Sequence, residues 1–578
     1  MKTWHYLIIF AIGAAMYVNT IGHGYVLDDK AIITQNKFTQ QGFAGIADHF
    51  THSYWFGING KSAGNYRPIS GASFSIEHAL FGNNPMMGHL LNILLFGLLC
   101  VVLLKWLNEM QVMPDHWLYL GILLFAVHPI HTEVVANIKS RDEIYCFLFF
   151  ALSAWMFWRG IQSNQKTQLL LSALFYLIAL LSKETALALL PIFPLMAYMK
   201  NQSMVSAVKL SLTPVAASLV FLGIYFSVTD LLADQQYHIF DNSLVQDPSD
   251  GELLATKIWI LGEYMKLMAV PYPLVYDYSF DTVQLVSFSN IQVILTLIGA
   301  MTIIGLTLKL IKYIKNNKIM VFIFLSLILI LPIVPVSNLL FPIGATMAER
   351  FLFIPSLGFT LLFTYSLYQL FEKRGISNSM ISKGLIAIIA IPMVLSTFAR
   401  NKAWESDEVL FANDLKHLHR SAKAHHNLAN IYKAKADGAN NNAKRVTFYE
   451  SAARLLEQAI GIYEVQEFHH ELGLIYGELG KWEGVKKSLG RYVEMNPSDA
   501  TAWMQIGIAN GMTQNMDDAQ LAFEKAHKLN PNEAEICLNL AKTYAIKNDL
   551  VRAKEVISAC EQIDPSNEAI QALKRELP

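Results

Sequence analysis

Long apolar runs separated by short polar joints fill the first 400 residues of the chain. Most of these runs approach the length of a helix that crosses a bilayer, which is about 20 residues. Beyond Asn401 the chain becomes charged and Ala-rich, with helical periodicity. The pattern therefore predicts an all-α protein with two domains: a polytopic membrane helix bundle at residues 1–400 and a charged helical domain at residues 401–578.

The apolar stretches predict about 11 membrane spans. They lie at about 4–22, 86–106, 117–130, 142–160, 168–183, 185–200, 206–228, 290–312, 319–337, 347–371 and 383–400. The region 168–200 permits two readings, because its polar break at 182–185 separates two short spans or interrupts one long helix. The first stretch has a basic start but no small-residue cleavage site after its apolar core, so we expect a retained span and not a signal peptide.

Composition and charge distribution support this topology. Hydrophobic residues make up 53% of the chain and charged residues only 16%, whereas soluble proteins carry about a quarter charged residues. Lysine and arginine gather in alternate joints, including 309–318 and 373–383, and such joints face the cytoplasm. With an odd number of spans, the loops 23–85 and 229–289 and the C-terminal domain lie on the other side. The net charge of −1 gives no argument for nucleic acid as a partner.

A period of 34 residues organises the C-terminal domain. Pro497, Pro531 and Pro565 are evenly spaced at this interval, and small residues keep the same register at Gly473, Gly507 and Ala541. This period is that of the tetratricopeptide repeat, in which proline ends the second helix of each pair. The predicted repeats are about 422–465, 466–499, 500–533 and 534–567; the first needs about ten extra residues, which the polar segment 439–442 can supply as a loop. Such solenoids bind proteins or peptides, and the alternative is a spacer or dimer contact.

The four cysteines predict no disulfide framework. Cys100 and Cys146 lie in apolar runs and are interpreted as small core residues. Cys537 and Cys560 form a pair only if the fold brings them together.

Chemistry-bearing residues recur in the joints that the topology places on the outer side. Asp28 and Asp29 follow the first span, and two adjacent acids at a membrane edge must be solvated or paired. Taken singly, each of the other polar residues is explained as a helix cap or a snorkelling anchor, but they converge on one leaflet. They are Arg67, His89, His128, His131, Glu133, Asn137, Arg141, Lys183, Glu184, Glu349 and Arg350.

A carboxylate facing several cations on one leaflet suits transfer of a sugar from a polyprenyl phosphate. The attacking hydroxyl needs one carboxylate to accept its proton. The leaving phosphate is stabilised by cations and hydrogen bonds. A metal site at His128, His131 and Glu133 is not expected, because the zincin spacing is absent and no cysteine is nearby. We therefore expect no metal and no cofactor.

An ordered series of motifs resembles a known family. The series comprises Asp28-Asp29, YRP at 66–68, HPIHTEVVANIKSRDE at 128–143, SKET at 182–185, EYMKLMAVPYPLVYDYSF at 263–280 and AERFLFIPS at 348–356, followed by the repeats. It is similar to the transmembrane and tetratricopeptide-repeat-containing (TMTC) O-mannosyltransferases, here of bacterial type. It is more distantly similar to the protein O-mannosyltransferases of the GT-C glycosyltransferase fold.

The resemblance implies a membrane enzyme that transfers mannose from a polyprenyl-phosphate donor to Ser or Thr of proteins on the non-cytoplasmic face, with inversion. It implies that Asp28 and Asp29 form the catalytic pair, one as base and one as its partner. Charge and sidedness suggest Arg141 as the first contact of the donor phosphate, followed by His128, Lys183 and Arg350. Arg67, His89, His131, Glu133 and Glu184 are further candidate site residues.

The expected location is a bacterial inner membrane, with the site and the repeats in the periplasm and the repeats presenting the acceptor protein. Two alternatives stay open at this point. One is a non-catalytic membrane anchor that displays the repeats as a scaffold for envelope assembly. The other is a transferase that modifies a surface glycan or lipid.

Overall fold

The computed structural model describes residues 1–62, 64–229, 238–246, 248–311, 315–375 and 379–578. Parts of the predicted cation-rich joints, 312–314 and 376–378, and parts of the long loop 229–289 lie outside the described residues. The described chain is helical, with one isolated β-bridge between Phe280 and Val283. It forms two compact units, Met1–His417 and Leu418–Pro578.

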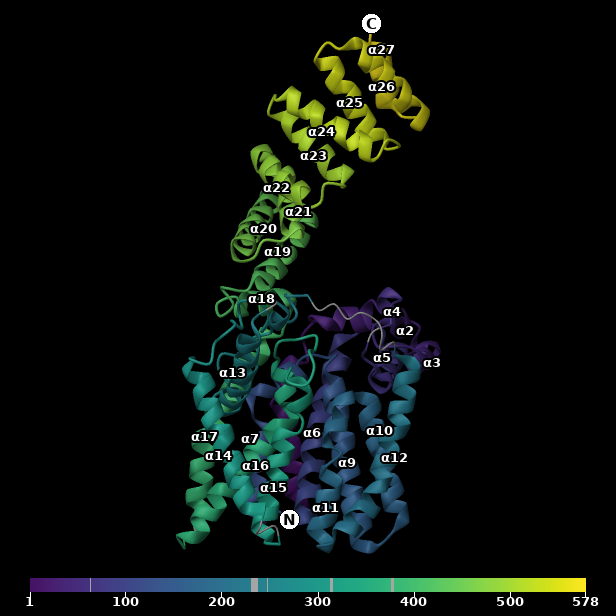
Figure 1. Cartoon of the computed structure of the whole chain (residues 1–578). Coiled ribbons are helices and arrows are strands. Elements are labelled where there is room, and N and C mark those ends of the chain that lie inside the picture. The colour runs from purple at the N-terminus through teal and green to yellow at the C-terminus, as the bar shows by residue number, and fades with distance from the viewer. Residues whose placement is uncertain (63, 230–237, 247, 312–314, 376–378) are drawn as a thin grey trace. The chain divides into compact units, whose positions relative to one another are not determined.

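The first unit is a bundle of long apolar helices (Figure 1). Each of the apolar stretches predicted from the sequence is helical over most of its described length. The helices are α1 (Thr3–Ala15), α6 (Pro85–Met110), α7 (Asp115–Ala126), α9 (Arg141–Ser163), α10 (Lys166–Ser182), α11 (Ile192–Asn201), α12 (Met204–Val228), α14 (Ile291–Ile311), α15 (Asn317–Ile330), α16 (Phe353–Lys373) and α17 (Ser379–Ala403).

Among the described residues, 6 helices are long and apolar enough to cross a membrane, and 7 if the bent pair Asp115–Ala126 and Pro129–Val135 counts as one span. Shorter helices such as α1, with 13 residues, and α10, with 17, fall below that length. The protein is thus a multi-pass helical membrane protein, and the total of about 11 spans stays a prediction. The chain breaks at Lys183, whose backbone is extended, so 168–200 forms two helices and not one.

The bundle is held together by close helix packing and presents apolar side chains on its outside. At Gly358 of α16 an added Cβ would lie 2.4 Å from the backbone nitrogen of Leu329, so only glycine permits α15 and α16 to approach this closely. Leu212 and Leu219 of α12 are 59% and 64% exposed. Large apolar side chains exposed on one helix suit contact with lipid.

Short helices lie at the end of the bundle opposite the N-terminus (Figure 1), and they carry the polar joints. The α-helices among the connecting segments are α2 (Lys37–Gln40), α3 (Ile46–Thr51), α4 (Phe56–Asn59), α5 (Pro68–Phe81), α8 (Thr132–Val135), α13 (Asp250–Ala269) and α18 (Asp407–Asp414). The short 3₁₀ and π helices are η1 (Val18–Thr20), η2 (Lys30–Thr34), η3 (Gly42–Gly45), η4 (Pro129–His131), η5 (Glu184–Leu189), η6 (Ser243–Val245), η7 (Val334–Val336) and η8 (Glu349–Leu352).

The membrane unit extends past the boundary expected at residue 400. Helix α18 follows the last span and belongs to this unit. At its end, the Asp414 carboxylate pairs with Arg400 and accepts a hydrogen bond from the Tyr276 backbone N–H at 2.8 Å. These contacts explain why the division between the units falls after His417, since they tie α18 to α17 and to the loop after α13.

The second unit consists of helix pairs. They are α19 (Ala422–Asp437) with α20 (Asn442–Ile462), α21 (Gln466–Glu478) with α22 (Trp482–Met495), α23 (Ala500–Met512) with α24 (Met516–Leu529), and α25 (Ala534–Ile546) with α26 (Leu550–Ile563), followed by α27 (Glu568–Glu576). Each pair lies within one of the four repeats expected from the sequence. The periodic prolines each stand two residues after a second helix, where no further backbone N–H is needed.

The small residues of the repeats lie where paired helices touch. An added Cβ at Gly507 would be 2.7 Å from the Phe523 ring, and the equivalent Gly473 faces Leu489. The first repeat differs from the prediction, because its helices are 16 and 21 residues long against 13 and 14 in the next. The extra residues lengthen both helices and do not form a loop, which suits a segment rich in Ala, Lys and Glu.

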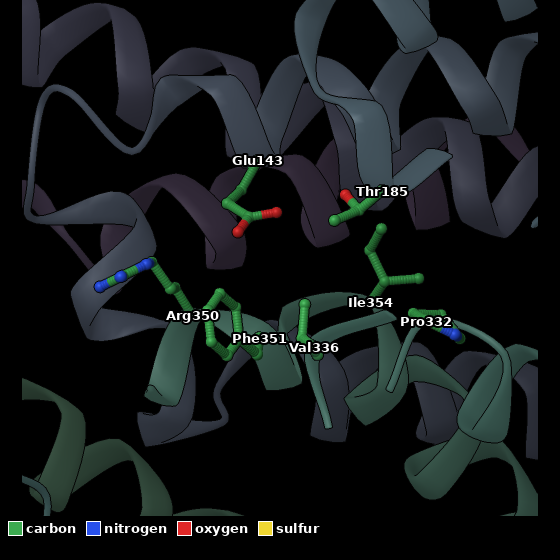
Figure 2. A pocket seen from close by; sticks show the side chains of 7 residues that line it. All are labelled: Glu143, Thr185, Pro332, Val336, Arg350, Phe351 and Ile354. Carbon is green, nitrogen blue, oxygen red and sulfur yellow. The ribbon is translucent and has the colours of Figure 1, made fainter. Parts of the chain in front are cut away.

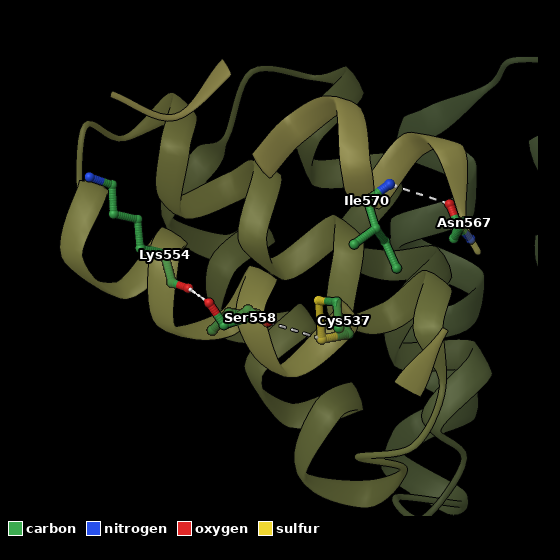
Figure 3. Close-up of a disulfide and its surroundings, with 7 residues drawn as sticks. Cys537, Lys554, Ser558, Asn567 and Ile570 are labelled. Atoms are coloured by element: carbon green, nitrogen blue, oxygen red, sulfur yellow. Dashed lines mark hydrogen bonds between the residues drawn. A yellow bond between two sulfur atoms is a disulfide. The ribbon is translucent and has the colours of Figure 1, made fainter. Parts of the chain in front are cut away.

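The fold also brings Cys537 and Cys560 together as a disulfide (Figure 3). Their Cα atoms lie 5.5 Å apart on the paired helices α25 and α26, a separation that a disulfide spans. The pairing that the sequence left conditional on the fold is therefore formed. Cys100 and Cys146 are free and buried, as predicted.

Candidate active site

The acidic pair follows a tight turn after the first helix. Asp28 is half exposed, with 50% of its side chain accessible, and its Oδ2 atom lies 3.9 Å from Lys139 Nζ. Asp29 is fully buried, and its carboxylate accepts hydrogen bonds from the backbone N–H groups of Lys139, at 2.6 Å, and Val26, at 3.1 Å. The two neighbours therefore have different surroundings: Asp28 faces solvent and a cation, whereas Asp29 fastens its own loop to the loop before α9.

Burial raises the pKa of Asp29 to about 7, although backbone N–H groups of Lys139, Val26 and Ile138 oppose the shift; the nearby Asp28 carboxylate raises it further. Burial also lowers the pKa of Lys139, against the attraction of Asp142 and Asp28. Both shifts have the same cause, since water is excluded where the two loops meet.

A chain of ion pairs extends from Lys139 into the bundle. Its Nζ lies 3.7 Å from Asp142 Oδ2, and the same oxygen accepts a hydrogen bond from Arg67 Nη1 at 2.7 Å. Arg67 also makes a two-pronged contact with Glu184, at 2.7 and 3.1 Å. Opposite charges thus alternate, so that the buried cluster is close to neutral, as buried charges require.

Two further pairs complete the cluster. Lys183 pairs with Glu143, and Arg350 pairs with Glu133, which also accepts the Arg350 backbone N–H at 2.8 Å. The Arg350 side chain is 28% exposed and interacts electrostatically with Asp28 and Glu143 as well. It is thus the more accessible of the cations predicted for the donor phosphate.

A pocket of about 240 Å³, including space open to solvent, borders Arg350. Figure 2 shows Glu143 and Thr185 on one side and Phe351 and Val336 on the other. Its remaining wall is formed by Pro332 and Ile354. The lining therefore combines a cation and hydrogen-bonding groups with an apolar surface, an arrangement that accepts an amphipathic molecule.

Four of the expected site residues, one arginine and three histidines, are not among those that line this pocket. Arg141 is fully buried, pairs with Glu77 at 2.8 Å and donates to Asn92 at 2.7 Å. His128 is buried between the Met268 carbonyl, at 2.9 Å, and the Ile130 N–H, which its Nδ1 accepts. Arg141 was the first residue expected to contact the phosphate. Its polar groups and those of His128 instead bind other parts of the protein.

The other two histidines also have internal partners. His131 Nε2 lies 2.8 Å from the Ser356 hydroxyl, and its ring packs against Phe353. His89 Nε2 lies 3.4 Å from the Gly24 carbonyl. His89 therefore contacts the loop that leads to the acidic pair, whereas His131 belongs to the core.

Sequence reasoning singled out Arg67, Lys183, Glu184, Glu133 and Arg350, and the structure joins all five in one cluster. It passed over Lys139, Asp142 and Glu143, which complete the cluster. One available signal was the adjacent acidic pair at 142–143, which stands at the edge of a span just as Asp28 and Asp29 do.

The fold and this cluster define a class: a multi-pass helical membrane protein that carries a charged cavity-lining cluster at one end of its bundle and a tetratricopeptide-repeat solenoid. The tetratricopeptide repeat family profile matches residues 512–577.

Curated proteins extend the similarity to the membrane unit. The chain is 24% identical over 614 residues to the mouse protein O-mannosyl-transferase TMTC3, covering 97% of this chain and 64% of that protein. It is 27% identical over 519 residues to human protein O-mannosyl-transferase TMTC2, covering 74% of this chain and 60% of that protein. The predicted resemblance to the TMTC family is confirmed along nearly the whole chain, which spans less than two thirds of the length of these relatives.

Solved structures are similar to part of the chain. The chain is similar to YrrB, described as a TPR protein with an unusual peptide-binding site, with a TM-score of 0.26 and 21% identity over 33% of this chain and 91% of that one. A likeness to MamA has a TM-score of 0.24, 15% identity and coverage of 28% and 87%.

Proposed function

We propose that the protein is a polyprenyl-phosphate-sugar-dependent protein O-glycosyltransferase, with mannose as the sugar. The observation that carries the proposal is the half-exposed carboxylate of Asp28, which lies 3.9 Å from Lys139 and interacts electrostatically with Arg350, a residue that lines the amphipathic pocket. The similarity to proteins named O-mannosyl-transferases supports the reaction class.

The two aspartates take different parts in this proposal. Asp28 is the base, because a general base must reach the hydroxyl whose proton it accepts, and its side chain is accessible. Asp29 is its positioning partner, because its buried carboxylate holds the loop to Lys139 and Val26. Asp28 Oδ accepts the proton of the Ser or Thr hydroxyl as that oxygen attacks the anomeric carbon.

The bond from the anomeric carbon to the phosphate oxygen breaks as the new glycosidic bond forms on the opposite face, so the anomeric centre inverts. The departing polyprenyl phosphate carries the negative charge. In this proposal Arg350 and Lys139 stabilise that charge, and the apolar wall of Val336, Phe351 and Ile354 accommodates the first isoprene units.

We further propose that this end of the bundle faces the periplasm of a bacterial cell and that the repeats present the acceptor protein. The cation-rich joints of the opposite side support this orientation. The Cys537–Cys560 bridge is a second, independent support, because disulfides persist in oxidising compartments.

The test compares Asp28→Asn with Asp48→Asn, a control carboxylate in the same outer loop, in a deletion strain complemented with each variant. Mass spectrometry of envelope proteins should reveal hexose on Ser or Thr in the wild type and the control. Asp28→Asn should lower its level about 10²–10⁴-fold, the usual contribution of a general base. Wild-type levels of hexose on envelope proteins in the Asp28→Asn strain would show that Asp28 is not the general base. An envelope proteome unchanged by deletion would favour the scaffold or the glycan-modifying transferase.

A further inference from the structure

The residue before Asp28 has an unusual backbone. Leu27 has a φ of 52°, in the left-handed region that non-glycine residues rarely adopt. Such a conformation persists only where surrounding contacts hold it. The contacts that hold Leu27 therefore also determine where the Asp28 side chain points.

Those contacts come from the opposite end of the membrane unit's sequence. The Leu27 backbone N–H donates to Asp407 Oδ1 at 2.8 Å, and Lys30 pairs with the other oxygen, Oδ2. The Gly24 N–H donates to the Glu405 carbonyl at 3.0 Å. One carboxylate thus contacts the chain on both sides of the acidic pair.

Asp407 is itself held firmly. It is the first residue of α18, whose cap is Ser406, and its side chain is only 11% exposed. Near the end of α17, Asn401 donates to the Met16 carbonyl and to the Asn19 side chain, both at 2.8 Å. The end of the last span is therefore fixed against the end of the first.

We propose that Asp407 is a positioning residue for the transfer reaction: it holds Leu27 in the left-handed turn that directs Asp28 toward the acceptor hydroxyl. Asp407 acts through the loop and touches neither substrate. The inference rests on the proposed function. Losing the hydrogen bond to Leu27 lets the turn relax, so fewer molecules hold Asp28 in the reactive geometry. The donor pocket at Arg350 is unaffected.

The predicted consequence is a loss in kcat without a matching change in KM for the donor. Asp407→Ala removes both contacts and should lower kcat about 10–100-fold, with the donor KM within about twofold. Asp407→Asn keeps an oxygen for the Leu27 N–H and should restore kcat to within about threefold. Lys30→Met removes only the ion pair and should also stay within about threefold, as expected for a partly exposed pair.

The assay uses the full-length protein in nanodiscs, polyprenyl-phosphate [14C]mannose as donor and envelope proteins of the deletion strain as acceptor. Ser406→Ala is the matched control, because it removes the cap of α18 and leaves the Asp407 contacts in place. If Asp407→Ala does not accumulate, Asp407→Glu takes its place, since its longer side chain displaces the oxygen from Leu27; a kcat loss at constant KM is again expected.

Three results overturn the inference while the wild type is active: full kcat in Asp407→Ala, an equal loss in Ser406→Ala, or a failure of Asp407→Asn to restore kcat. The first result would mean that the turn at Leu27 keeps its conformation without Asp407. The second would mean that the loss of kcat comes from the cap of α18, and the third that it does not come from the hydrogen bond to Leu27. An inactive wild type overturns the proposed function and this inference together.

Discussion

Asp29 should make the stability of the membrane unit fall as pH rises. Its carboxylate is fully buried, and burial raises its pKa from 3.8 to about 7. In the unfolded chain the group loses its proton near pH 4, whereas in the folded protein it keeps the proton until about pH 7. Between these values the folded state binds more protons, so the free energy of unfolding decreases with pH.

The magnitude follows from the two pKa values. A difference of about 3 between the folded and unfolded pKa values corresponds to about 4 kcal/mol in the free energy of unfolding. This contribution is lost once the pH passes about 7. Asp29→Asn has no proton to release, so the stability of the wild type relative to this variant should drop by about 4 kcal/mol between pH 4 and pH 8. For a unit of this size the change corresponds to a shift in Tm on the order of 5 °C.

Thermal unfolding followed by tryptophan fluorescence measures this difference, with both proteins purified in one detergent and heated at several pH values from 4 to 8. Asp29→Ser serves as a second non-ionising variant. A wild-type advantage that is constant across this range, or that grows with pH, would refute the assignment of a raised pKa to Asp29.

Three further predictions concern other parts of the molecule. Glu77→Ala should destabilise the membrane unit by about 3–5 kcal/mol, measured by thermal unfolding, because it leaves the buried charge of Arg141 unpaired; a change below 1 kcal/mol would contradict this. Cys537→Ser should lower the stability of the repeat unit by about 3 kcal/mol, from the closure of a loop of 23 residues, and added reductant should have no effect on this variant. Gly358→Ala should lower the free energy of unfolding of the membrane unit by about 1–3 kcal/mol, as overpacking does, because the added Cβ would clash with the Leu329 backbone. Size-exclusion chromatography should then show less folded protein.

Most of the architecture was predictable because its causes are local. An apolar run forms a helix in lipid whatever surrounds it, since no other structure satisfies its backbone there. The repeat register was equally readable, because Pro497 and its equivalents mark the ends of second helices directly. The insertion in the first repeat was misread: residues 439–441 do lie in the connection between α19 and α20, but the extra residues of this repeat lengthen the two helices.

The site was predictable only in part, because its geometry depends on partners far apart in sequence. In the sequence Arg141 has no evident partner, because Glu77 pairs with it only in the folded protein. No local sequence signal near either residue indicates that ion pair. Lys139 was missed for the opposite reason, since a lysine at a helix start is usually an ordinary surface residue. The contact between Asp407 and Leu27 could not be predicted from the sequence, because the two residues are 380 positions apart.

The contact between Gly24 and Glu405 has a consequence for biosynthesis. A nascent chain inserts its spans in order from the N-terminus, so the loop with the acidic pair reaches its side of the membrane before the last span exists. The hydrogen bonds that the loop donates to Glu405 and Asp407 form only after that final helix has been inserted. Assembly of the loop is therefore completed late, and a ribosome that stalls before residue 400 leaves a membrane-inserted product whose acidic loop lacks this support.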